Sequence, residues 1–484
     1  MPVVSSSLAA AERLLRRNEP EAALRTLAEE IATASTFRPE HALELRILLA
    51  RGERARAAAA LDRALHLPAE TADAFDALAY YARELGRHEL SNMLYRRAAS
   101  LAPDDPQLSY NLATSERSLG HTAEALRACE RTLALDPSSL PTLLLRSEIG
   151  RATAERNHIG QLQARLAAAP ADAARMFIGY ALGKELHELG RYDEAFDAFA
   201  TAAAARRRNL SYDVADDEKK LSRIQEVYPS PPGLPGGSDS DRHIFVVGLP
   251  RSGTTLIERI LSALPQVRSN GETNNLSTAL ISCAPSAGGD IFERSARADP
   301  SAVARAYDSL AAPADGQDKI IEKLPLNYLY IGAIVAAFPK TKIVWVRRDP
   351  IDNCFAMFRT LFGDGYPFSY SFEELARYYA AYDRLMRHWE ATVPQNLVEL
   401  RYEDLVRAPA AVASEVAGRC GLSWTQDALD LSRNRRASLT ASATQVRGPI
   451  YRTSAGVWKQ YEAHLQPLVT QLNAPRVDAP GNII

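Results

Sequence analysis

The sequence has few cysteines and no strong excess of charge of either sign. Its 484 residues include four cysteines, Cys129, Cys283, Cys354 and Cys420, and none belongs to a C-x-x-C pair. This spacing argues against a zinc site or a disulfide framework and favours a reducing compartment, so we expect a cytoplasmic protein. The formal net charge is −2. General nucleic-acid binding is therefore not expected, because it requires a basic excess, although a local basic pocket remains compatible with this charge.

Long hydrophobic runs are also missing. No apolar run reaches the roughly 18 residues that a membrane span requires, so we expect no membrane association. The first thirty residues are rich in alanine but contain Arg13, Arg16, Arg17 and Glu19, which is not typical of a signal peptide. A chain of 484 residues is too long for one ordinary core and predicts two or three domains.

The first 205 residues contain an internal repeat. They are rich in Ala, Leu and Arg with almost no β-branched runs, which favours helix. Leu78, Ala79, Leu85, Gly86, Leu101 and Pro103 recur 34 residues later as Leu112, Ala113, Leu119, Gly120, Leu135 and Pro137. A glycine between two helices and a proline after the second resemble the tetratricopeptide repeat (TPR). We expect five or six units, with a degenerate one at 139–170, where the turn glycine is lost.

The repeat pattern predicts the shape of such an array but not what it binds. Each unit is a helix pair that buries its apolar face only by stacking on its neighbours, so the units should form a superhelix. The concave surface either docks a peptide or protein acceptor or serves only as a scaffold, and both readings stay open. A homodimer also stays open.

The array ends at a stretch rich in proline, glycine and serine, PSPPGLPGGSDSD at 229–241. Such a stretch cannot continue a helix. We therefore divide the chain into a repeat array at 1–205, a connecting helix and linker at 206–241, and a second domain at 242–484.

The second domain alternates strands with helices. Continuous apolar runs predict buried strands in the segments HIFVVGL, DKIIEK, TKIVWVRR and NLVELRY. Helices are predicted between them at 254–264, 326–338, 351–362 and 371–392. This order predicts a parallel sheet covered by helices on both faces, with ligands at the carboxyl ends of the strands.

One strand is followed by a phosphate loop that lacks its usual lysine. Gly248–Thr255 reads GLPRSGTT, which has the spacing G-x4-G-K-[ST] with Thr254 in the lysine position. The backbone amides and helix dipole of such a turn still attract an anion. Ser252, Thr254 and Thr255 add hydroxyl donors, Gly253 gives the turn, and Arg251 adds a cation. The loop should therefore hold a small phosphate-like group rather than a magnesium triphosphate.

PRSGTT after an apolar strand resembles the 5′-phosphosulfate loop of the sulfotransferases, which use 3′-phosphoadenosine 5′-phosphosulfate (PAPS) without a metal. A second segment, IVWVRRDPIDNCFAMFRTLF at 343–362, resembles the family's 3′-phosphate site. The resemblance implies that Arg348 and Arg359 bind that phosphate; the other reading of Arg348 is an ion pair with Asp349 or Asp352. Ala356 stands where the family usually has serine, so one hydrogen bond to the phosphate is absent.

The catalytic pair also comes from the resemblance, which is to tyrosylprotein sulfotransferases and their bacterial relatives. It implies that Glu272 is the base and that Lys323 stabilises the bridging oxygen of the leaving nucleotide. The other readings are a solvated surface glutamate and a lysine that only neighbours Glu322. His187 and His243 are not expected to act as the base.

Three further residues follow from the same resemblance. Tyr402 would pack near the nucleotide or else serve as a core tyrosine. Ser442 would reach the phosphosulfate and Arg447 would close over the nucleotide, within a C-terminal clamp at 435–461. A basic residue is often found where Val457 stands.

The chain is thus identified as a member of the bacterial TPR sulfotransferases, with an all-α repeat superhelix and an α/β domain with a parallel sheet. We expect transfer of the sulfuryl group of PAPS to an acceptor hydroxyl by Glu272, Lys323, Arg251 and Ser442. A peptide tyrosine is the first candidate acceptor and a carbohydrate or small-molecule hydroxyl the second. A nucleotide kinase or NTPase, and a decayed nucleotide-binding scaffold, are the remaining alternatives.

Overall fold

The computed structural model describes residues 5–169, 171–230, 236–311, 318–431, 450, 454–473, 477–478 and 482–483. The chain separates into two compact units, Met1–Ile149 and Gly150–Ile484. This division falls within the degenerate repeat rather than at the predicted boundaries of 205 and 241, which follow the change in sequence pattern.

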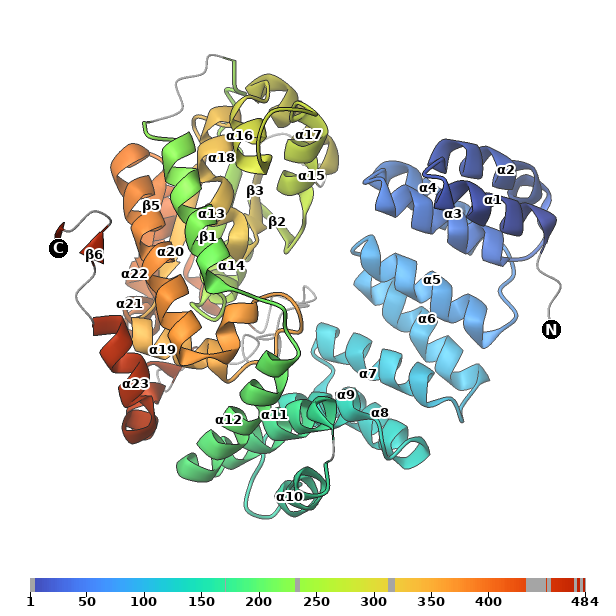
Figure 1. Ribbon diagram of the computed structural model, residues 1–484. Helices are drawn as coiled ribbons and strands as arrows, with labels where there is room; N and C mark the ends of the chain where they lie inside the picture. The colour runs from blue at the N-terminus through green and yellow to red at the C-terminus, as the bar shows by residue number, and fades with distance from the viewer. Residues whose placement is uncertain are drawn as a thin grey trace. The chain divides into compact units, whose positions relative to one another are not determined.

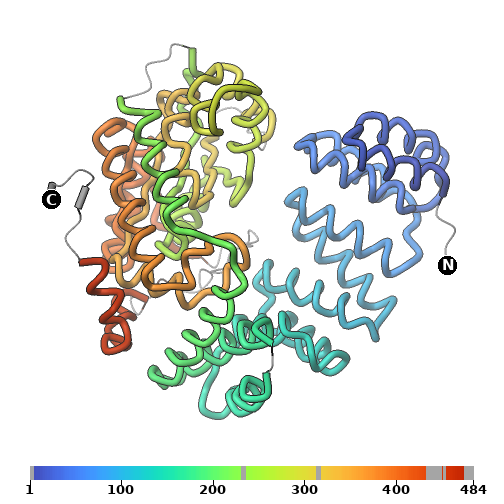
Figure 2. Tube along the Cα trace, in the orientation of Figure 1, coloured from blue at the N-terminus to red at the C-terminus, as the bar shows by residue number. Residues whose placement is uncertain are grey.

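The first unit is a series of antiparallel helix pairs, coloured blue to cyan in Figure 2. Its helices are α1 (Ser6–Arg16), α2 (Pro20–Thr33), α3 (Pro39–Ala50), α4 (Arg54–Leu65), α5 (Ala72–Glu84), α6 (His88–Leu101), α7 (Pro106–Leu119), α8 (Thr122–Leu135) and α9 (Leu140–Ile149). The turn glycines Gly52, Gly86 and Gly120 all have left-handed φ angles, 73°, 80° and 83°. A left-handed turn residue is most easily a glycine, and this explains the period seen in the sequence.

The repeat pattern continues into the second unit. Here lie α10 (Ile159–Ala167), α11 (Asp172–Glu188), α12 (Tyr192–Arg208) and α13 (Val214–Val227). Gly190, between α11 and α12, repeats the left-handed turn at φ 74°. Among the described helices, α1–α2, α3–α4, α5–α6, α7–α8 and α11–α12 pack as pairs, whereas α9 packs on α8 and α10 on α11, on either side of a long connection at 150–158.

The rest of the second unit is an α/β domain around a five-stranded parallel sheet in the order β2-β3-β1-β4-β5 (Figure 1). The strands are β1 (His243–Gly248), β2 (Val267–Gly271), β3 (Lys319–Lys323), β4 (Lys342–Arg347) and β5 (Leu397–Arg401). The helices are α14 (Thr254–Ser262), α15 (Asn275–Cys283), α16 (Ile291–Ala296), α17 (Pro300–Leu310), η1 (Pro325–Tyr330), α18 (Ile331–Ala337), α19 (Pro350–Phe358), η2 (Pro367–Tyr370), α20 (Phe372–Thr392), α21 (Tyr402–Arg407), α22 (Pro409–Arg419), η3 (Gln426–Leu429), η6 (Val457–Tyr461) and α23 (Glu462–Asn473), with two-residue strands β6 (Val477–Asp478) and β7 (Asn482–Ile483).

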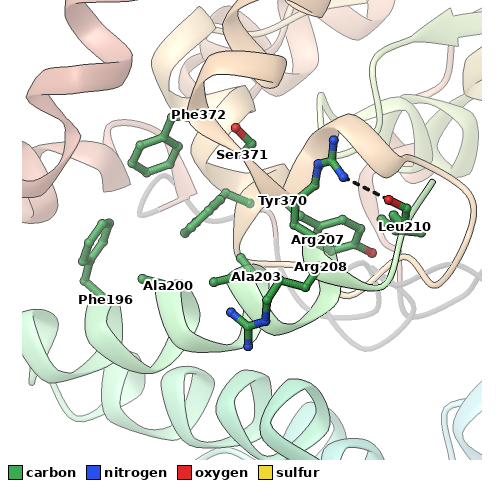
Figure 3. Close-up of a pocket in the computed structure, with 11 residues that line it drawn as sticks. Phe196, Ala200, Ala203, Arg207, Arg208, Leu210, Tyr370, Ser371 and Phe372 are labelled. Carbon is green, nitrogen blue, oxygen red and sulfur yellow. Dashed lines mark hydrogen bonds between the residues drawn. The ribbon is translucent and has the colours of Figure 1, made fainter. Parts of the chain in front are cut away.

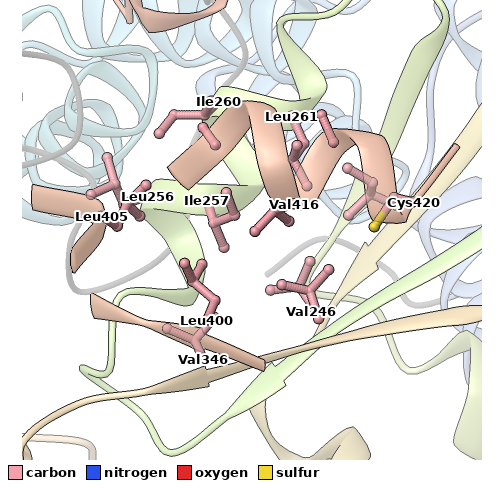
Figure 4. Packing of buried hydrophobic residues seen from close by; sticks show 14 of the residues in the cluster. Val246, Leu256, Ile257, Ile260, Leu261, Val346, Leu400, Leu405, Val416 and Cys420 are labelled. Atoms are coloured by element: carbon pink, nitrogen blue, oxygen red, sulfur yellow. The ribbon is translucent and has the colours of Figure 1, made fainter. Parts of the chain in front are cut away.

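The predicted fold class is confirmed. Alternation along the strands sends Val246 and Val346 into a core formed with α14 and α22 (Figure 4). The intervening Phe245 and Trp345 face the other side, where Phe245 packs on Tyr307 of α17 and Trp345 donates a 2.7 Å hydrogen bond to Tyr382 of α20. The sheet is therefore covered on both faces, as a parallel sheet requires.

Two predicted segments differ in detail, and one strand was not predicted. The helix predicted at 351–362 ends at Phe358, because the chain turns away toward Gly363, which has a φ of 63°. The first part of the segment 326–338 is the 3-10 helix η1 rather than α-helix. Strand β2 was not predicted, since its sequence VRSNG is short, polar and mostly half-buried.

Candidate active site

All five strands of the main sheet end beside a predicted site residue. β1 leads into the phosphate loop, β2 into Glu272, β3 ends at Lys323, β4 leads into Arg348 and β5 into Tyr402. Because the strands are parallel, their carboxyl ends share one edge of the sheet, and the connections from β1 leave in opposite directions there, which is the position where ligands bind in sheets of this kind. His243 starts β1 at the opposite edge.

The phosphate loop is held by the segment after β4. Arg348 Nη1 donates to the carbonyl of Arg251 at 2.9 Å, and Asn353 Nδ2 donates to the carbonyl of Pro250 at 2.7 Å. Two loop carbonyls are thus tied to α19 and its entry turn. A loop whose carbonyls are bound outward can direct its amides inward, which is the arrangement that binds an anion.

Backbone geometry explains the two glycines of this loop. Gly248 and Gly253 have φ angles of 152° and 108°. A Cβ on Gly248 would lie 2.6 Å from the carbonyl oxygen of Val346, and one on Gly253 would collide with the ring of Tyr402. Arg251 also has a positive φ, 65°, which is uncommon for a residue with a side chain.

The loop carries an unpaired buried hydroxyl. Ser252 is 1% exposed, and its Oγ has no hydrogen-bond partner among the described residues. Thr254 and Thr255, also buried, are the first two residues of α14, where backbone N–H groups have no partner inside the helix. An unpaired buried hydroxyl is costly, and an oxyanion in the loop would satisfy it.

Three arginines lie near this loop. Burial, together with the charges of Arg348 and Arg251, lowers the pKa of Arg359 to about 10, against the opposing effects of Tyr461 and Asp352. The Nε atoms of Arg348 and Arg359 are buried and have no hydrogen-bond partner among the described residues. A cluster of partly satisfied cations fits a bound phosphate.

Arg348 has several partners within the protein, and its binding of a 3′-phosphate stays a prediction. Its Nη2 lies 3.8 Å from Asp352, which is longer than a good charged hydrogen bond, and also donates to the carbonyl of Ser454. Its guanidinium lies 4.9 Å from the centre of the Tyr402 ring. Arg348 therefore contacts the loop, Ser454 and Tyr402, and it does not form a surface ion pair.

Tyr402 is buried behind the phosphate loop, and its packing near the nucleotide stays a prediction. It is the first residue of α21 rather than the end of the strand, and it is 8% exposed. Its ring packs against Gly253 and its hydroxyl bonds Ser454 Oγ. This buried tyrosine thus forms the back wall of the phosphate loop.

Asp352 was considered only as a possible partner of Arg348, yet it organises the C-terminal segment. It is 2% exposed and accepts hydrogen bonds from the backbone amides of Gly456 and Trp458, the latter at 3.0 Å. Val457 between them is buried. Asn353 donates to the carbonyl of Pro250 and thereby supports the loop. The predicted contacts of Ser442 and Arg447, and Arg435, Arg436 and Arg452, lie outside the described residues.

Glu272 and Lys323 are in direct contact. Lys323 Nζ donates to Glu272 Oε1, and the lysine side chain is 2% exposed while that of the glutamate is 36% exposed. Lys323 alternates with Glu322, so it shares a sheet face with Ile321 and α14. The structure therefore brings together a half-exposed carboxylate and a buried ammonium, which suits a base beside a cation.

The last repeat pair contacts Tyr461, which lies beside α19. The Nδ1 atom of His187 on α11 lies 2.8 Å from the hydroxyl of Tyr461. The ring of Tyr461 packs on Phe355, with 4.5 Å between the ring centroids. Burial and the charge of Arg359 lower the pKa of His187 to about 3. The neutral His187 is thus a contact between the repeats and the site, which the sequence did not indicate.

A separate cavity of about 650 Å³ lies between α12, α19 and the η2–α20 corner (Figure 3). Its walls are largely apolar, with Phe196, Phe358 and Phe372, and its Arg207 is paired with Glu374 at 2.7 Å. None of the predicted site residues that the structure describes lines it. Across the same described part of the chain, no group of three His, Cys, Asp or Glu could hold a metal ion, and no helix is long and apolar enough to cross a membrane.

Comparison with known proteins gives the family. Residues 243–426 match the model described as the sulfotransferase family. The α/β domain therefore belongs to the sulfotransferase family, and the chain combines it with TPR-type helix pairs. An uncharacterized protein of Aquifex aeolicus (strain VF5) is 29% identical over 368 residues, 73% of this chain and 48% of that protein. The chain thus spans about half the length of that relative.

Several solved structures are similar over one part of the chain. YrrB, a TPR protein with an unusual peptide-binding site, has a TM-score of 0.28 at 17% identity over 40% of this chain and 89% of its own. A sulfotransferase from Alicyclobacillus acidocaldarius has a TM-score of 0.28 at 18% identity, over 48% of this chain and 94% of its own. The sulfotransferase domain of the Synechococcus PCC 7002 olefin synthase has a TM-score of 0.30 at 14% identity, over 48% of this chain and 98% of its own. At these scores the assignment depends on the family match alone.

Proposed function

We propose that this chain is a PAPS-dependent sulfotransferase that moves a sulfuryl group to an acceptor hydroxyl. The observation that carries the proposal is the contact between Glu272 and Lys323 at the strand ends. Beside it lies a phosphate loop without a lysine, in which the buried Ser252 hydroxyl has no hydrogen-bond partner within the described part of the chain. A base, a cation and an oxyanion cradle are the three groups that sulfuryl transfer needs.

The described residues fit the two charged ends of the nucleotide. Ser252, Thr254 and Thr255 would hold the 5′-phosphosulfate with the amides at the start of α14. Arg348 and Arg359 would hold the 3′-phosphate, each with a buried Nε that has no hydrogen-bond partner among the described residues. Tyr402 would fix the loop from behind.

The proposed chemistry uses this chain's own side chains to move one proton and hold one charge. Glu272 takes the proton of the acceptor hydroxyl, and the acceptor oxygen forms a bond to sulfur. The bond between sulfur and the bridging oxygen breaks, and its electrons stay on the departing 5′-phosphate. Lys323, being almost fully buried, stabilises the charge on that oxygen strongly because little water screens it. Arg251 and Ser442 complete the proposed set.

A peptide tyrosine is the acceptor we favour. Burial raises the pKa of Tyr366, and the nearby Glu272 carboxylate raises it further. Its ring packs edge-on against Phe362 at 4.8 Å, and aromatic side chains of this kind suit an aromatic acceptor ring. The TPR helices would dock the rest of the peptide. A carbohydrate or small-molecule hydroxyl is the second candidate.

Calorimetric binding of 3′,5′-adenosine bisphosphate without metal, beside Mg-ATP, tests the donor class. We expect the bisphosphate to bind with micromolar affinity and Mg-ATP to bind far more weakly. Preference for Mg-ATP would refute the proposal in favour of a kinase or NTPase. Binding of neither nucleotide would favour a decayed scaffold.

A further inference from the structure

A fully buried carboxylate lies behind the Glu272–Lys323 pair. Glu322 is 0% exposed, and it precedes Lys323 on β3, with its side chain on the opposite face of the sheet. It accepts a 2.9 Å hydrogen bond from the hydroxyl of Tyr307 on α17 and a 3.2 Å bond from Nδ2 of Asn327 on η1. Burying a carboxylate in a sheet is costly, even when it is hydrogen-bonded.

The neighbouring strand is irregular where it faces Glu322. Ser269 pairs with Ile321, but the next pair is Gly271 with Glu322, so Asn270 is an extra residue on β2. Gly271 has a left-handed φ of 68°, and Glu272 follows at once. A bulge of this kind redirects the side chains beside it, and here it redirects the chain that carries Glu272.

The same tyrosine joins the carboxylate to the bulge. The Tyr307 hydroxyl, which donates to Glu322, also interacts with the side chain of Asn270. The Thr273 hydroxyl and the Leu276 amide also act to lower the pKa of Glu322, against the larger effect of burial, although the Thr273 hydroxyl has no hydrogen-bond partner among the described residues. Glu322 is therefore linked through Tyr307 to Asn270, two residues before Glu272, and through the backbone to Lys323.

We propose that Glu322 is a positioning residue for sulfuryl transfer, which sets the β2 bulge and the end of β3 so that Glu272 and Lys323 meet. The proposal rests on the proposed function and deepens it, because it names a residue that touches neither the donor nor the acceptor. Its ionised form is the working form, since only a carboxylate accepts from Tyr307 and Asn327 without a donor of its own to satisfy.

Burial raises the pKa of Glu322 to about 7, although Tyr307 and Asn327 oppose the shift. Two further ionisable groups lie close to Tyr307: Asp308 on α17 raises the pKa of that tyrosine, and His243 on β1 packs edge-on against it at 5.1 Å. His243 Nε2 is itself 2.8 Å from Asp308. The Glu322 carboxylate should therefore titrate near neutral pH beside a neighbouring histidine–aspartate pair.

Three variants of the full chain test the proposal. Glu322→Gln keeps the shape but turns one acceptor oxygen into an amide donor, so Tyr307 or Asn327 loses its partner. Tyr307→Phe keeps Glu322 and removes the link to Asn270. Tyr382→Phe is the matched control, because this buried hydroxyl accepts from Trp345 instead. The measurements are kcat and KM against pH with PAPS and a phenol acceptor, affinity for adenosine bisphosphate, and crystal structures.

We expect kcat to fall about tenfold or more in Glu322→Gln, because small displacements of reacting groups are costly, while adenosine bisphosphate affinity and acceptor KM change little. The wild-type rate should rise with pH through an inflection near 7; this inflection should vanish in Glu322→Gln and move upward in Tyr307→Phe. Tyr382→Phe should match the wild type in both respects.

The crystal structures separate failure of this inference from failure of the proposed function. In Glu322→Gln we expect Glu272 and Lys323 to be separated. An unchanged contact together with an unchanged kcat and pH profile would overturn the positioning role. If the wild-type chain transferred no sulfuryl group, the proposed function would fail, and an unchanged Glu272–Lys323 contact in the variant would still overturn the positioning role.

Discussion

Arg348 donates a 2.9 Å hydrogen bond to the carbonyl of Arg251, so the segment after β4 holds the loop after β1. The predicted 3′-phosphate arginine is thereby also a support of the predicted 5′-phosphosulfate loop. One side chain would couple the two ends of the donor site, and the consequences of removing it can be measured.

Arg348→Lys should weaken binding of adenosine bisphosphate by about 10- to 100-fold, because a lysine cannot reproduce the planar, multiple donors of a guanidinium and hydrogen bonds to charged groups contribute about 1.5–3 kcal/mol. Arg347→Lys is the matched control, since the neighbouring guanidinium pairs with Glu399 at 2.7 Å and lies over Trp345. Calorimetry measures both. Equal losses in the two variants would contradict the role of Arg348.

Ala356→Ser should strengthen donor binding. Ala356 lies one helical turn beyond Asn353 on α19, on the face that contacts the loop at Pro250. A hydroxyl there would restore one hydrogen bond to the 3′-phosphate, worth about 1–3 kcal/mol. Ala376→Ser, on α20 and equally buried at 5% exposed, should leave the affinity unchanged. Weaker or unaltered binding in Ala356→Ser would place the 3′-phosphate elsewhere.

Stability should depend on pH through Glu322. Burial raises the pKa of this carboxyl from 4.5 to about 7, so between those values the folded chain holds a proton that the unfolded chain has released. The contribution of Glu322 to the free energy of unfolding should therefore be greatest below pH 4.5 and be lost as pH rises through 7, by up to about 3 kcal/mol. Urea unfolding of the wild type and Glu322→Gln across this range should show the slope only in the wild type. A slope that persists in the variant would assign it to other groups.

The contact between His187 and Tyr461 should link the repeats to the donor site. Tyr461→Phe and His187→Ala should each lower the free energy of unfolding, and the hydrogen bond itself should contribute about 1 kcal/mol. A double-mutant cycle isolates this coupling from the packing lost in each single variant. Purely additive losses would show that the two side chains do not interact in solution.

The sequence predicted the parts of the fold that local pattern determines. Four strands were recognisable from short apolar segments with β-branched residues, and the turn glycines Gly86 and Gly120 marked the repeat because each needs a left-handed φ. Strand β2 was missed because a half-buried edge segment such as VRSNG carries no apolar run. Its partner β3 and the bulge at Asn270 supply what the local sequence does not.

The site was predictable to the level of its motifs, and tertiary contacts account for the rest. The loop, Glu272, Lys323 and Arg348 came from resemblance, whereas the packing of Tyr402 on Gly253 joins residues far apart in the chain. Glu322 was read only as a neighbour of Lys323, since nothing in the sequence shows that Tyr307 would reach it. The strand alternation at 322 and 323 is the signal that could have separated the two side chains.

The most direct test of the account is transfer of labelled sulfur from PAPS to hydroxyl acceptors by the wild type and Glu272→Gln, with Glu390→Gln, an exposed carboxylate of α20, as the matched control. We predict that the wild type and the control label a tyrosine peptide flanked by acidic residues. Glu272→Gln should be about 10²- to 10⁴-fold slower while binding adenosine bisphosphate normally. Equal rates in Glu272→Gln and the wild type, or no transfer by the wild type to any peptide, phenol or sugar acceptor, would contradict the central claim.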